Sequence, residues 1–142
     1  MNFATARGLE ATTERRTILL VDDRDDTLLP LARLLQLCGY DVRLAHTAAE
    51  ALGQAAAPVP VDLLISDVGL PDRSGIDLMR DVKQRFGLRG IAVSGYTSDD
   101  DVRACQAAGF ARHLPKPILF DDLLSAIGDV LATPVACPPS SS

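Results

Sequence analysis

Residues 63–75 read LLISDVGLPDRSG, and this stretch decides the fold class. Its first three residues are apolar and typical of a buried strand, whereas Gly69, Pro71 and Gly75 indicate a loop. Asp67 therefore stands where a strand ends, which is the edge at which open α/β sheets bind ligands. An isolated aspartate at such a place often only forms a turn, so the other strand ends must be compared.

Polar groups suited to phosphate chemistry also follow the other strand-like runs: Asp22 and Asp23 after residues 18–21, Ser94 and Gly95 after residues 91–93, and Lys116 after residues 111–114. Three carboxylates at one edge repel each other unless a cation lies between them, and oxygen ligands suit Mg²⁺. A hydroxyl, a glycine N–H and a lysine can each bind a phosphoryl oxygen. Together the strand ends predict a magnesium-dependent phosphoryl site.

The alternation of strand-like and helix-like segments predicts an α/β fold, a doubly wound, flavodoxin-like parallel sheet of five strands flanked by five helices. The strand order 2-1-3-4-5 would bring the ends of the first, third and fourth strands together, with Asp22, Asp23, Asp67 and Ser94 on them. The fifth strand is then an edge. Pro115 agrees with that position, since proline has no N–H to donate to a neighbouring strand.

Caps and apolar spacing predict the helices. Thr47 and Glu50 form a capping box, and Ser98 caps a later helix. Cys38 and Cys105 lie on apolar helix faces and are predicted to be buried thiols. The helix that begins at residue 74 or 75 is predicted to bury Ile76, Met79, Val82 and Phe86.

Over residues 17–131 the sequence resembles the receiver domain of two-component response regulators. The resemblance is carried by ILLVDDRDD (18–26), LLISDVGLPDRSGIDL (63–78), IAVSGY (91–96) and AAGFARHLPKP (107–117). It implies that Asp67 accepts a phosphoryl group from a histidine kinase or a histidine phosphotransfer protein. It also implies a cis Lys116–Pro117 bond and phosphoryl contacts from Ser94 and Lys116. The implied Mg²⁺ ligands are Asp22, Asp23, Asp67 and the backbone carbonyl of Gly69.

Three positions depart from the commonest pattern of that family. Gly69 has no side chain to shield or orient a hydrolytic water, and Tyr96 could cover the same approach. His113 stands where the family usually has a tyrosine or phenylalanine that acts as a switch together with the hydroxyl matching Ser94. These departures concern signalling and phosphoryl lifetime more than phosphorylation itself.

The chain has 142 residues, enough for one domain with a real core. We expect a flexible extension or linker over 1–16, a receiver domain over 17–131 and a disordered tail over 132–142. A DNA-binding output domain is not expected after the last helix, so signalling would occur through protein contact. We expect a monomer or a weak, phosphorylation-dependent dimer.

Net charge and hydropathy limit the classes of partner and the cellular location that are expected. The net charge is −5 and the pI is about 4.8, which argues against a nucleic-acid partner. Neither a membrane-length apolar run nor a signal-peptide pattern is evident, so a cytoplasmic protein without a membrane partner is predicted.

Other functional classes remain open. Asp23-x-Asp25-x-Thr27 after an apolar strand also matches the nucleophile motif of haloacid-dehalogenase-like phosphatases, although that interpretation leaves Asp67 without a role. A degenerate receiver that serves only as a scaffold is a further alternative. A true receiver could be free-standing or part of a hybrid histidine kinase.

Overall fold

The computed structural model describes residues 16–58, 60–95 and 98–132. Within them, strands and helices alternate along the chain as predicted. The strands are β2 (Thr17–Val21), β3 (Asp41–Ala45), β4 (Leu63–Asp67), β5 (Arg89–Ser94) and β6 (Phe110–Pro115). The helices are α1 (Asp25–Leu37), α2 (Ala48–Ala55), α3 (Gly75–Phe86), α4 (Asp99–Ala108) and α5 (Phe120–Ala132).

All neighbouring strands are parallel, and the sheet order is β3-β2-β4-β5-β6. Counted along the chain this is the predicted order 2-1-3-4-5, so the doubly wound fold is confirmed. Pro115 closes the edge strand β6, and the Lys116–Pro117 bond is cis, both as predicted. The predicted extension, the predicted tail and the suggested role of Tyr96 concern residues that are almost all outside the described ranges.

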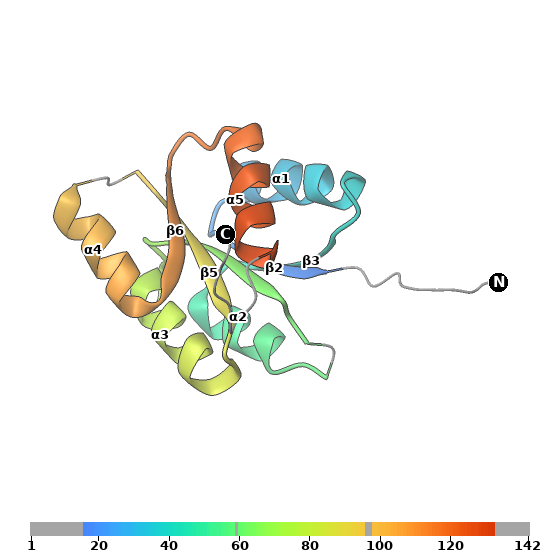
Figure 1. Ribbon diagram of the computed structural model, residues 1–142. Helices are drawn as coiled ribbons and strands as arrows, with labels where there is room; N and C mark the ends of the chain where they lie inside the picture. The colour runs from blue at the N-terminus through green and yellow to red at the C-terminus, as the bar shows by residue number, and fades with distance from the viewer. Residues whose placement is uncertain (1–15, 59, 96–97, 133–142) are drawn as a thin grey trace.

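Two helical layers cover the two faces of the sheet, α1 and α5 on one side and α2, α3 and α4 on the other (Figure 1). Successive strand residues point to opposite faces. Leu19 and Leu64 accordingly pack in the core beneath α2, α3 and α4, whereas Ile18, Leu63 and Ile65 pack beneath α1 and α5. Both faces being buried explains why the strands read as continuous apolar runs.

The predicted caps form, with one change. The hydroxyl of Ser98 caps α4, and Thr47 Oγ1 accepts from the N–H of Glu50 at the start of α2. The Glu50 carboxylate, however, accepts from the N–H of His46, one residue before the expected partner Thr47. Ser74 caps α3, so the helix that follows the Asp67 loop begins where the sequence predicted.

Two burial predictions were wrong. Cys38, the residue that follows the end of α1 at Leu37, is exposed, whereas Cys105 is buried as predicted. In α3, Phe86 is 37% exposed at the last helical position. Leu78, rather than Phe86, is buried beside Met79 and Val82.

Candidate functional site

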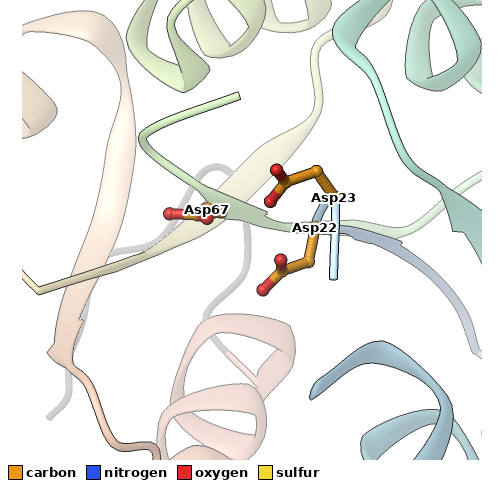
Figure 2. A group of neighbouring side chains, drawn as sticks. All are labelled: Asp22, Asp23 and Asp67. Atoms are coloured by element: carbon orange, nitrogen blue, oxygen red, sulfur yellow. The ribbon is translucent and has the colours of Figure 1, made fainter. Parts of the chain in front are cut away.

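Three aspartates meet at the carboxyl ends of β2 and β4 (Figure 2). Asp67 is the last residue of β4, and Asp22 directly follows β2, whose Val21 pairs in register with Ser66. One carboxylate oxygen from each of Asp22, Asp23 and Asp67 lies within 4.8 Å of the others. The strand order therefore brings Asp67 together with Asp22 and Asp23, which precede it by 45 and 44 residues in the sequence.

Asp22 is the most buried member of this cluster, at 5% exposure. Burial raises the pKa of its carboxyl, and the charge of Asp67 acts in the same direction. Hydrogen bonding from the backbone N–H of Arg24 at 3.0 Å and the ammonium of Lys116 oppose that rise without cancelling it. A hard cation among these three oxygens would offset both the burial and the repulsion, so the donor set fits Mg²⁺.

Lys116 reaches this cluster from the end of the edge strand. Its Nζ lies 3.1 Å from Asp67 Oδ2 and 3.4 Å from Asp22 Oδ2. Burial acts to lower the pKa of this lysine, but the hydrogen bond and charge of Asp67, with Asp22, outweigh it and raise the pKa. Lys116 is therefore an ammonium at neutral pH, placed to bind a further anion beside Asp67. Its backbone N–H donates to the carbonyl of Ser94 at 2.9 Å, which holds the two strand ends together.

The loop between β4 and α3 turns back at once after Asp67. Gly69 donates its N–H to Asp67 Oδ1 at 3.2 Å and forms an isolated antiparallel bridge with Ser74. The N–H of Gly75 donates to the carbonyl of Val68 at 2.7 Å. At Gly75 a Cβ would overlap the carbonyl oxygen of Asp67, so this close turn requires glycine. Gly69 thus lies beside the carboxylates, where the sequence predicted it.

Ser94 ends β5 and is buried, and Gly95 follows it at the same sheet edge. His113 lies on β6 opposite Ala92 in the register. Its side chain is half-buried, and its Nε2 is buried without a hydrogen-bond partner among the described residues. One nitrogen of this imidazole is therefore surrounded by protein and not by water.

Sequence reasoning missed two sets of contacts beside the site. His46 Nε2 lies 2.6 Å from Asp25 Oδ1, and the Asp25 hydrogen bond, with help from Glu50, raises the pKa of His46. Asp72 accepts two backbone hydrogen bonds from the start of α2. The partners lie 21 to 24 residues apart in sequence, so no local pattern announces them.

The same contacts disfavour the phosphatase alternative. Its motif requires Asp25 to act together with Asp23 in the site, but Asp25 is exposed in the first turn of α1 and pairs with His46. Asp67, to which that alternative gives no role, lies in the carboxylate cluster instead.

Among the described residues, no helix is both long and apolar enough to span a membrane.

Comparison with known proteins agrees with this geometry. Residues 18–128 match the family model of the response regulator receiver domain. The chain is 36% identical over 110 residues to the transcriptional regulatory protein KdpE of Mycobacterium tuberculosis, covering 78% of this chain and 48% of KdpE. It is 33% identical over 117 residues to the sensor kinase CckA of Brucella abortus, covering 81% of this chain and 12% of CckA. The chain thus spans half or less of these two relatives.

A solved structure shows the same fold. The CheY-like response regulator receiver domain protein from Methanospirillum hungatei superposes with a TM-score of 0.77 at 32% identity. The match covers 84% of this chain and 95% of that one. Family match, fold and carboxylate cluster agree, and the chain belongs to the response regulator receiver domain family, whose members are signalling domains rather than enzymes.

Proposed function

We propose that Asp67 accepts a phosphoryl group from a phosphohistidine of a histidine kinase or a histidine phosphotransfer protein. A carboxylate oxygen of Asp67 attacks phosphorus, the bond from phosphorus to the histidine nitrogen breaks, and its electron pair stays on that nitrogen. An acyl phosphate on Asp67 results. The observation that carries this proposal is the cluster of Asp22, Asp23 and Asp67 with Lys116 Nζ 3.1 Å from Asp67 Oδ2.

Each neighbouring group has a part in that transfer. Asp22, Asp23, Asp67 and the backbone carbonyl of Gly69 would hold Mg²⁺, which supplies charge neutralisation for the approach of an anion. The ammonium of Lys116 pairs with Asp67 before transfer and with a phosphoryl oxygen afterwards. The hydroxyl of Ser94, at the end of β5, and the N–H of Gly95 would donate to the other phosphoryl oxygens.

The donor protein would dock on an apolar groove beside the site. The groove has a volume of about 290 Å³ between α1 and the segment that follows β6, and Lys116 lines both the groove and the site. Leu34, which is 42% exposed, offers apolar surface there. Receiver domains interact with histidine kinases, and an apolar helix carrying the phosphohistidine fits a groove of this kind. The lining residues are Thr27, Pro30, Leu31, Leu34, Lys116, Pro117, Ile118 and Phe120.

Output would pass through Ser94 and His113. In receiver domains the hydroxyl matching Ser94 moves to the phosphoryl group, and the switch side chain fills the space it leaves. An imidazole is smaller and more polar than a phenol ring, so filling that space with His113 brings less apolar burial. Phosphorylation would therefore bias this switch weakly.

Mass spectrometry after incubation with acetyl phosphate and Mg²⁺ tests the phosphoacceptor. Wild-type protein should gain one phosphoryl group, Asp67→Asn none, and Asp23→Asn much less. Asp99→Asn, at an exposed aspartate outside the carboxylate cluster, is the control and should match wild type. Undiminished labelling of Asp67→Asn would refute the proposal, and equal labelling with and without Mg²⁺ would refute its metal part.

The donor groove needs a separate experiment. Leu34→Glu should lower kcat/KM for phosphoryl transfer from a phosphorylated histidine phosphotransfer protein, because it places a charge in the apolar groove. The same variant should react with acetyl phosphate as wild type does, since the small donor needs no docking. Leu37→Glu changes another exposed leucine of α1 that does not line the groove, and this control should have a smaller effect.

A further inference from the structure

We propose that Asp72 is a positioning residue for the magnesium site, a role that rests on the proposed function. Its carboxylate fastens the loop between β4 and α3 to the first turn of α2. Oδ1 accepts from the N–H of Ala48 at 2.8 Å, and Oδ2 accepts from the N–H of Ala49 at 3.0 Å. Both oxygens are therefore used, and both donors belong to another element.

These contacts add to the capping that α2 receives from Thr47. Thr47 already caps the helix, since its Oγ1 accepts from the N–H of Glu50 at 3.0 Å. The N–H groups of Ala48 and Ala49 have no partner inside the helix, because the first-turn amides of any helix lack one. The bond from Ala48, with that from Ala49, lowers the pKa of Asp72, as the positive end of the α2 dipole also favours. Asp72 thus stays ionised near neutral pH and holds the loop.

The other contacts of the loop link the position of Asp72 to that of Gly69. At the base, the Gly75 N–H donates to the Val68 carbonyl, and Gly69 bridges Ser74. At the tip, Asp72 is bound to α2 while the next residue, Arg73, lies 2.9 Å from Asp81 Oδ2 on α3. Gly69 belongs to the base, and only Leu70 and Pro71 separate it from Asp72 at the tip, so we infer that its carbonyl direction depends on both anchors.

Without Asp72 the tip would keep Arg73 and the packing of Leu70 against the core. The loop would still form, but the Gly69 carbonyl would be oriented less firmly. Asp72→Ala should therefore weaken Mg²⁺ binding rather than abolish it. We expect about a tenfold higher Kd, at the low end for residues that orient metal ligands.

The experiment titrates Mg²⁺ into wild type, Asp72→Ala, Asp72→Asn and Thr47→Ala, with Kd read from amide NMR shifts. Thr47→Ala is the matched control, because it removes a cap of the same helix without releasing the loop. It should also lower the unfolding midpoint but leave Kd unchanged. Asp72→Asn retains one acceptor oxygen and should lie between wild type and Asp72→Ala.

Failure of the positioning role of Asp72 can be distinguished from failure of the proposed function. An unchanged Kd in Asp72→Ala, or an equal loss of affinity in Thr47→Ala, would overturn the positioning role and leave the proposed function standing. Wild-type protein that binds no Mg²⁺ would overturn the metal site and the role of Asp72 together, whereas acetyl phosphate labelling of Asp67 would still report separately on the phosphoacceptor.

Discussion

The ammonium nitrogen of Lys116 lies 3.1 Å from Oδ2 of Asp67. Lys116 follows the edge strand β6, and Asp67 is the last residue of the central strand β4. The second contact of Lys116, at 3.4 Å, is to Asp22. One ammonium does not neutralise three carboxylates, so the cluster stays repulsive in the metal-free protein. The metal-free fold therefore bears a free-energy cost that Mg²⁺ or a carboxylate substitution would relieve.

Mg²⁺ is accordingly expected to raise the thermal unfolding midpoint. A ligand that binds only the folded state at ten times its Kd contributes about 1.4 kcal/mol, or roughly 3–6 °C in a domain of this size. Asp67→Asn should raise the midpoint in EDTA and reduce the Mg²⁺ shift, whereas Asp99→Asn should do neither. Calorimetry with EDTA and with millimolar Mg²⁺ measures both. An unchanged wild-type midpoint would contradict a metal site.

Gly75→Ala is expected to lower the free energy of unfolding by about 1–3 kcal/mol, the usual cost of an overpacked site. The added methyl group would meet the backbone carbonyl of Asp67, which is not free to move aside. Gly128→Ala in α5 is the control, because its Cβ would meet nothing within 4 Å. Urea unfolding should show Gly128→Ala slightly more stable, since alanine favours helices over glycine. Equal effects at both glycines would contradict the close contact at Gly75.

Gly69→Leu is expected to lengthen the lifetime of the acyl phosphate. A Cβ at Gly69 has nothing within 4 Å, so the backbone leaves room for a side chain to begin there, and a leucine would shield the site from water. We expect hydrolysis roughly threefold slower, or about 0.6 kcal/mol in activation free energy. Release of inorganic phosphate after removal of the donor measures the rate. Hydrolysis as fast in Gly69→Leu as in wild type would show that water approaches from another side.

The fold and the carboxylate cluster could be predicted from sequence because parallel strands end at a common edge. Strand-end residues such as Asp22, Asp67 and Lys116 are marked by the apolar runs before them, so the alternation and the doubly wound strand order together place them at one edge. Cys38 was assigned wrongly for a local reason, namely that the helical stripe was continued one residue beyond the end of α1. Apolar spacing does not report where a helix ends.

The hydrogen bonds around α2 could not be predicted from the sequence, for a different reason. Asp72 and Asp25 are exposed acidic residues like many others in this chain, and their partners are backbone amides and one histidine on distant segments. Hydrogen bonds of this kind depend on how two loops face each other across the sheet edge, which hydrophobic periodicity does not encode.

A pH effect is expected at His46. Its pKa is raised by the hydrogen bond to Asp25, so NMR titration should give a value above the usual 6.5 or so. A raised histidine pKa contributes stability that is fully present below the unfolded-state value and is lost as pH rises through the folded-state value. Asp25→Asn should return the pKa toward 6.5 and flatten that dependence. A titration of His46 that is the same in Asp25→Asn would contradict the pairing.

His113→Phe is expected to stabilise the protein by about 1 kcal/mol. The Nε2 atom of His113 is buried without a hydrogen-bond partner in the described part of the chain, and such an atom costs about 1–3 kcal/mol. A phenyl ring carries no polar atom and keeps a similar shape. Denaturant unfolding of the unphosphorylated protein measures the change, and a destabilised variant would mean that the imidazole has a partner in solution.

The switch proposed for His113 can be tested in the same protein. Beryllofluoride, which mimics a phosphoryl group on a carboxylate, should shift the ring-proton resonances of His113 if the space beside Ser94 changes on phosphorylation. Asp67→Asn is the control, since it cannot hold the mimic and should show no shift. His113→Phe should then give a larger response in the neighbouring β6 amides, because burying a phenyl ring gains more than burying an imidazole. Ring resonances of His113 that stay in place with bound beryllofluoride would leave the imidazole without a part in the output.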